Sequence, residues 1–126
     1  GDVVAVIGEL GRSAAGYALW HNAIDGFDAL RQRHLVPEPP YGQGVVAARA
    51  GATAMTDVSD GLLADVGHIA SASGVRIALS TAGLRVDLDA VAAAAAVLGS
   101  DPWEWVLGGG EDHALVATFP VALPPG

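Results

Sequence analysis

Hydrophobic runs of strand length alternate along the chain with segments in which apolar residues recur every three or four positions. The run VVAVIG at residues 3–8 is continuous and rich in β-branched residues, which is typical of a strand buried on both faces. Further strands are predicted at residues 53–57, 75–79 and 113–119.

Helices are predicted between these strands. The clearest spans residues 62–70, where apolar side chains recur at the spacing of a core-facing stripe, and Gly74 ends it. Ser13 is expected to cap an earlier helix, and Asp101 to cap a later one with proline and glutamate in its first turn. The other helices are expected at residues 27–34, 44–50 and 88–98, and a proline-rich connector at 36–42.

Because helices alternate with strands, the pattern predicts an α+β fold, a layered α/β/α sandwich on a mixed sheet. The 126 residues have the length of a single domain, which we place at residues 1–126. Hydrophobic residues make up 52% and charged residues 16%, so the composition excludes an intrinsically disordered chain.

Charge and residue usage exclude several classes of function. A formal net charge of −8 argues against binding to nucleic acid or to an anionic membrane surface, because the field of the protein repels phosphate polymers. All six basic residues are arginine, so catalysis by lysine is ruled out in this chain. The absence of cysteine is compatible with a reducing compartment, and we expect a cytoplasmic protein. The longest apolar run, residues 90–98, is well short of the roughly 20 residues that a membrane span needs.

One candidate site is the segment DVSDG at residues 57–61, between a predicted strand and a predicted helix. Asp57 and Asp60 offer hard oxygen ligands of the kind that Mg²⁺ takes, and Ser59 offers a donor to a phosphate oxygen. The alternative is that Ser59 or Asp60 merely caps the helix. Spacing alone favours the cap.

Two glycine-rich segments are further candidates. Three glycines at 108–110 allow a ligand to approach the main chain and precede Glu111, Asp112 and His113, but a helix stop with a solvated turn explains the segment equally well. The segment GELGRS at residues 8–13 departs from known phosphate loops, so an ordinary strand-to-helix turn is favoured there.

Taken together, these segments resemble the C-terminal domain of the thiamine-monophosphate kinases, which belong to the aminoimidazole ribonucleotide synthetase superfamily. Four strings match that family in order, namely GELGRSAAG at residues 8–16, the proline-rich residues 37–42, AMTDVSDGL at 54–62 and GGEDHAL at 109–115. The resemblance implies a partly ferredoxin-like fold and an enzyme that transfers phosphate from ATP to thiamine monophosphate, giving thiamine diphosphate. It implies Asp57 and Asp60 as Mg²⁺ ligands, Ser59 as a nucleotide contact and Glu111 as a contact to thiamine monophosphate. No residue is expected to act as a nucleophile.

The resemblance also implies parts that this sequence lacks. In the family an N-terminal domain carries most metal and nucleotide contacts and forms the dimer, and a C-terminal segment brings an aromatic residue to the substrate. We therefore expect the chain to be inactive alone and to belong to a homodimeric enzyme. His113 and Ala114 replace the usual tyrosine and glutamate. The alternatives are a related ATP-dependent maturation factor or synthetase, or a non-catalytic protein-interaction module.

Overall fold

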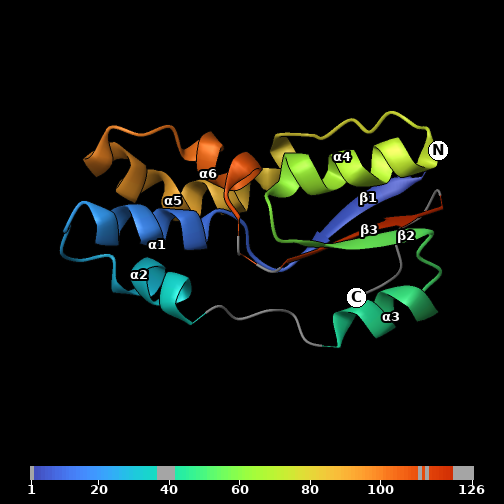
Figure 1. Cartoon of the computed structure of the whole chain (residues 1–126), viewed down its shortest axis with the longest axis horizontal. Coiled ribbons are helices and arrows are strands. Elements are labelled where there is room, and N and C mark those ends of the chain that lie inside the picture. The colour runs from blue at the N-terminus through green and yellow to red at the C-terminus, as the bar shows by residue number, and fades with distance from the viewer. Residues whose placement is uncertain (1, 37–41, 111, 113, 121–126) are drawn as a thin grey trace.

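A computed structural model of the chain describes residues 2–36, 42–110, 112 and 114–120. Three strands form an antiparallel sheet in the order β1-β3-β2, with β1 at Val3–Ile7, β2 at Ala54–Val58 and β3 at Ala114–Phe119. Val3 pairs with Phe119 and Val58 with Ala114. Since β1 and β2 both run antiparallel to β3, the ends of β1 and β2 meet the start of β3 at one edge of the sheet (Figure 1).

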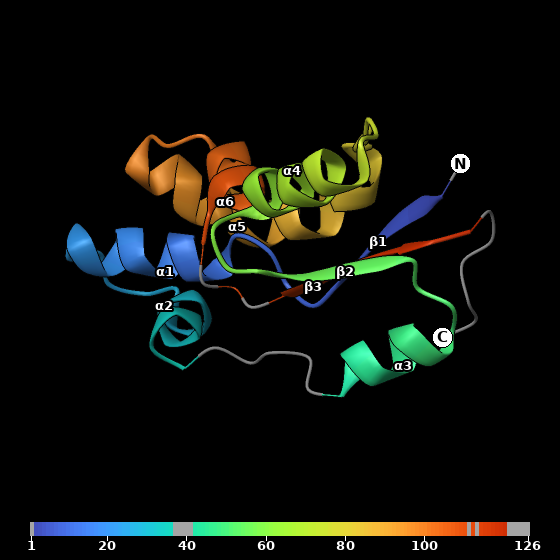
Figure 2. The same ribbon diagram turned by 45° about the vertical axis from the view of Figure 1, so that its right-hand side comes forward.

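Helices cover both faces of this sheet. The chain forms α1 at Arg12–His21, α2 at Asp28–Leu35, α3 at Gln43–Arg49, α4 at Leu62–Ser73, a short 3₁₀ helix at Ala82–Leu84, α5 at Arg85–Leu98 and α6 at Pro102–Gly108. Figure 2 shows α4, α5 and α6 on one side of the sheet and α3 on the other, with α1 and α2 beyond the strand ends.

The central strand β3 joins two hydrophobic clusters. All six of its residues are buried, which fits a middle strand whose two faces are both covered. Ala114 and Val116 pack with α4, α5 and α6, whereas Leu115, Ala117 and Phe119 pack with Ala47 of α3. The two-residue alternation of a strand therefore divides the core between the two faces. The layered α+β prediction is confirmed, and Asp101 caps α6 as expected, accepting a hydrogen bond from the Trp103 amide at 2.9 Å.

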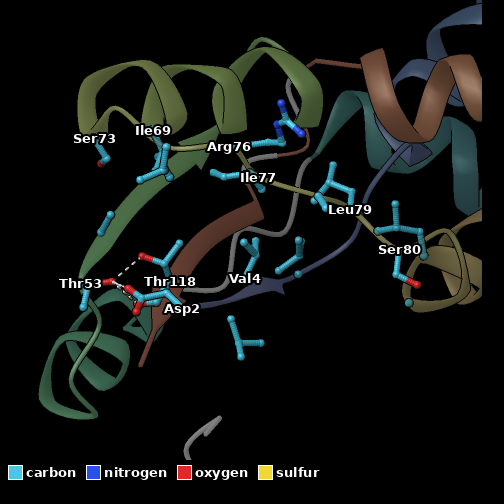
Figure 3. A pocket seen from close by; sticks show the side chains of 18 of the residues that line it. Asp2, Val4, Thr53, Ile69, Ser73, Arg76, Ile77, Leu79, Ser80 and Thr118 are labelled. Atoms are coloured by element: carbon cyan, nitrogen blue, oxygen red, sulfur yellow. Dashed lines mark hydrogen bonds between the residues drawn. The ribbon is translucent and has the colours of Figure 1, made fainter. Parts of the chain in front are cut away.

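Two expectations are wrong in detail. Residues 75–79 form no strand, and the sheet of the described residues is antiparallel rather than mixed. Ile77 and Leu79 are half-buried against the core while Ala78 between them is exposed, so the alternation is present without strand pairing (Figure 3). The pattern of apolar positions indicates which side chains face the core. It does not indicate whether another backbone lies within hydrogen-bonding reach.

The caps expected for two other helices also differ. Ser13 lies inside α1 and is buried, and the N-cap is Gly11 in a left-handed conformation with no side-chain cap. Likewise Gly61 is the N-cap of α4 and receives no side-chain hydrogen bond, so neither Ser59 nor Asp60 caps that helix. Amides in these two loops donate instead to the carboxylates of Asp112 and Asp65.

Candidate functional site

The predicted ligands Asp57, Ser59 and Asp60 lie where β2 gives way to α4. Val58 is fully buried and fixes the end of the strand, and strand alternation turns the neighbouring Asp57 outward. The side chains of Asp57, Ser59 and Asp60 are all exposed. Within the part of the chain that the structure describes, neither of the two carboxylates forms an ion pair. These oxygen atoms are therefore available to a ligand.

Asp65 fixes the backbone of this loop from inside. Its Oδ2 atom accepts hydrogen bonds from the amides of Ser59 at 2.9 Å and Asp60 at 3.0 Å, and only 4% of the residue is exposed. Asp65 is not among the predicted site residues. The signal was its position between Leu62 and Val66, on the buried face of a helix, where a carboxylate requires partners.

The glycine-rich loop before β3 touches the loop after β2. A Cβ atom built on Gly61 would lie 2.8 Å from the carbonyl oxygen of Gly108, and one on Gly110 would lie 2.7 Å from that of Ser59. Both distances are shorter than side chains tolerate, so glycine at these positions allows the two main chains to meet. The glycine triplet therefore ends α6 and also allows close contact with the loop after β2.

Asp112 brings the loop after β1 to the same place. Its Oδ2 accepts a hydrogen bond from the Gly11 amide at 2.8 Å and its Oδ1 from the Ser13 amide at 3.0 Å, across about a hundred residues of sequence. Burial raises the pKa of Asp112 above its ordinary value, against the opposing effects of both amides and of the charge on Arg12. All three candidate segments thus converge at one edge of the sheet, and residues 8–11 form the expected turn between β1 and α1.

Arg12 is engaged within the protein and not offered to an anion. Its guanidinium forms an ion pair with Asp87 at the start of α5, and these side chains are only 14% and 16% exposed. Asp87 also accepts a hydrogen bond from the Leu10 amide at 3.1 Å. The pair therefore anchors the loop between β1 and α1 to α5. The carboxylates of Asp57 and Asp60, by contrast, face solvent.

The donor set at this edge suits a hard divalent cation. Exposed carboxylates beside a loop of fixed backbone are the oxygen ligands that Mg²⁺ takes while it keeps several waters. Ligand atoms of Asp60, Asp65 and His68 also lie within 4.8 Å of one another. Glu111, the predicted contact to thiamine monophosphate, lies outside the described residues, as does His113.

A separate cavity of about 1040 Å³ lies between β1, α4 and residues 75–80 (Figure 3). Its lining is mainly apolar and includes none of Asp57, Ser59 and Asp60. No helix among the described residues is long and apolar enough to cross a membrane.

Fold and site together define an α+β domain with a candidate cation site at the loop edge of an antiparallel sheet. The chain belongs to the family described as AIR synthase related protein, C-terminal domain, which matches residues 1–117. The resemblance drawn from the four motifs is therefore confirmed at the level of the family.

The chain is similar to several thiamine-monophosphate kinases. It is 68% identical over 126 residues to that of Mycobacterium tuberculosis H37Rv, covering all of this chain and 38% of the relative. It is 43% identical over 123 residues to that of Corynebacterium glutamicum, covering 94% of this chain and 37% of the relative. The chain thus spans less than two fifths of the length of these relatives.

Solved structures of thiamine-monophosphate kinases are also similar to this chain. The crystal structure of thiamine monophosphate kinase from Aquifex aeolicus superimposes with a TM-score of 0.76 at 35% identity, over 99% of this chain and 44% of that one. A structure of AaThiL complexed with AMPPCP and TMP gives a TM-score of 0.73 at 36% identity, over 95% of this chain and 40% of that one.

Proposed function

We propose that this chain is the C-terminal part of an enzyme that transfers the γ-phosphoryl group of ATP to thiamine monophosphate, giving thiamine diphosphate and ADP. A phosphate oxygen of thiamine monophosphate attacks the γ-phosphorus, and the bond from that phosphorus to the β–γ bridging oxygen breaks. The relatives named for this activity support the proposal, as does the similar structure that carries AMPPCP, an ATP analogue, together with TMP.

The observation that carries the proposal is the convergence of three loops at one sheet edge, with exposed acidic ligands on one of them. Asp57 and Asp60 would hold Mg²⁺ there, and Ser59 would donate a hydrogen bond to the nucleotide. Bound Mg²⁺ neutralises charge on the phosphates during phosphoryl transfer. The chain itself positions its ligands through contacts that leave these oxygens free, such as the amide hydrogen bonds to Asp65.

Glu111 would contact thiamine monophosphate from the glycine-rich loop. Its neighbour Asp112 is bonded to the start of α1, so the loop is fixed immediately beside Glu111 in the sequence. No residue of this chain is needed as a nucleophile, because phosphoryl transfer depends on positioning and charge neutralisation.

The remaining parts of the proposal concern the longer protein. An N-terminal domain would supply most ATP and metal contacts, and the active enzyme would be a homodimer in the cytoplasm, where ATP is available. The 126-residue chain alone would then make no thiamine diphosphate from ATP, Mg²⁺ and thiamine monophosphate. Turnover by the chain alone would contradict this.

The test compares the full-length wild-type protein with its Asp57→Asn and Asp60→Asn variants. We expect each variant to lose about a hundredfold or more in kcat, equivalent to about 2.7 kcal/mol of transition-state stabilisation. Asp89→Asn is the matched control, because Asp89 is an exposed aspartate on α5. Full activity in both site variants would reject the metal-ligand roles, and a wild type that makes no thiamine diphosphate would reject the substrate.

A further inference from the structure

Among the described residues, Asp65 is the one buried carboxylate. An isolated buried carboxylate is costly, so its hydrogen bonds indicate what the fold uses it for. Within the described part of the chain, both hydrogen bonds that its side chain accepts come from the loop between β2 and α4, and both converge on the same oxygen, Oδ2. Asp65 therefore joins the start of α4 to two consecutive peptide groups of the loop that carries the predicted ligands.

This arrangement determines what the loop presents to solvent. The amides of Ser59 and Asp60 point inward to Asp65, while the side chains of the same two residues are exposed. Fixing two successive peptide groups restricts the backbone angles between them, which in turn restricts where the Ser59 and Asp60 side chains lie. Without the acceptor, both amides would need water or a rearranged loop.

A second interpretation of Asp65 is that it binds a metal directly with Asp60 and His68, whose ligand atoms lie within 4.8 Å of it and of one another. The contacts favour positioning over ligation. Oδ2 of Asp65 already accepts two hydrogen bonds and the residue is 4% exposed, whereas Asp60 and His68 are exposed.

We propose that Asp65 is a positioning residue that holds Ser59 and Asp60 in the geometry for binding a nucleotide and a divalent cation. This inference rests on the proposed function for the identity of the ligands. The contact between Asp65 and the loop is independent of the proposed function. Asp65 acts through the backbone of its neighbours and touches neither substrate nor metal.

The two hydrogen bonds share one oxygen, so a substitution can remove the charge of Asp65 and keep the acceptor. In Asp65→Asn the amide oxygen can take the place of Oδ2 and accept both hydrogen bonds, so the position is kept and the charge is lost. In Asp65→Ala both are lost. Val66→Ala is the control, because Val66 is the buried neighbour on the same helix and its truncation removes packing but no acceptor.

The experiment uses the full-length protein and two readouts. Hydrogen exchange of the Ser59 and Asp60 amides is measured without ligand, and Mn²⁺ binding is measured by electron paramagnetic resonance without substrate. We expect Asp65→Ala to speed exchange and weaken Mn²⁺ binding by about tenfold each, and Asp65→Asn and Val66→Ala to stay within about threefold of wild type. The Mg²⁺ concentration for half-maximal activity should follow the same order.

Two results would overturn the inference. If Asp65→Asn loses Mn²⁺ binding as severely as Asp65→Ala, Asp65 is a ligand through its charge. If Asp65→Ala leaves both readouts within about threefold of wild type, the contact positions nothing. Should Asp65→Ala fail to fold, Asp65→Asn still decides, since retained Mn²⁺ binding supports positioning and a loss of about tenfold rejects it. Neither readout needs turnover, so a failure of the proposed kinase activity would be seen separately.

Discussion

Removing the Asp112 carboxylate should release two loops from each other. Each of its oxygens accepts one amide hydrogen bond, from Gly11 at 2.8 Å and from Ser13 at 3.0 Å, and both donors belong to buried residues. Leaving a buried donor without a partner costs about 1–3 kcal/mol. Asp112→Ala should therefore lower the free energy of unfolding by about 4 kcal/mol. Asp112→Asn should lower the free energy of unfolding by about half as much. Its side-chain oxygen still accepts one of the two hydrogen bonds, but its NH₂ group faces the other backbone amide, which is also a donor.

The assay is urea unfolding of the 126-residue chain, followed by tryptophan fluorescence. Asp89→Ala on the exposed side of α5 is the control and should change the free energy of unfolding by less than about 0.5 kcal/mol. A loss below about 1 kcal/mol for Asp112→Ala would refute the reasoning, since the two amides would then have found other partners.

The same residue should affect how stability depends on pH. Burial raises the pKa of Asp112 above 3.8 in the folded chain, so the folded state binds its proton more tightly than the unfolded state does. The contribution of Asp112 to stability is therefore largest at low pH and falls as the pH rises from about 3.8 through the raised pKa. Unfolding of wild type and Asp112→Asn at matched pH values isolates this change, because the other carboxyl groups titrate in both. If wild type instead gained stability relative to Asp112→Asn as the pH rises over that interval, the pKa of Asp112 would not be raised in the folded state.

Three further substitutions test contacts around the site by the same unfolding assay. Gly61→Ala should cost about 2–4 kcal/mol, because φ is +126° and the new Cβ would lie 2.8 Å from the Gly108 oxygen; an unchanged midpoint would mean that the loops do not touch. Arg12→Leu should cost about 3 kcal/mol, because it leaves the largely buried Asp87 without its cation, and a loss under about 1 kcal/mol would contradict this. Asp101→Ala should cost only about 1 kcal/mol, the usual effect of removing a helix cap, and no loss would argue against the cap.

Local patterns were sufficient for most of the fold. The helix at Leu62–Ser73 and its end at Gly74 follow from apolar spacing and from a left-handed C-cap, both of which act within one or two turns. The helix Arg85–Leu98 begins three residues earlier than expected, since burial of Leu84 and Leu88 extends the stripe backward. Residues 75–79 were mispredicted because strand pairing depends on a partner elsewhere in the chain.

The segments of the candidate site were identified from the sequence, and the roles of their residues stay predictions. The segments that hold Asp57, Ser59 and Asp60 stand out because acidic residues and glycines interrupt apolar elements, and their exposure in the structure is compatible with a ligand site. Two contacts were missed. Asp112 bonds a loop about a hundred residues away, and the role of Asp65 depends on which way the amides of the turn point.

Those two contacts explain why the capping interpretation of the motifs was wrong. A serine or aspartate side chain that accepts hydrogen bonds from the amides of its own loop is not available to bind a ligand. Here Asp112 accepts hydrogen bonds from amides at the start of α1, and Asp65 accepts them from two amides before α4. The side chains of Ser59 and Asp60 cap neither helix. Outward-facing carboxylate oxygens on a fixed backbone suit a cation, and the Ser59 hydroxyl can donate a hydrogen bond to a phosphate oxygen. The division between residues that hold the loops and residues that face the ligand is therefore the strongest structural argument that this sheet edge is a binding site.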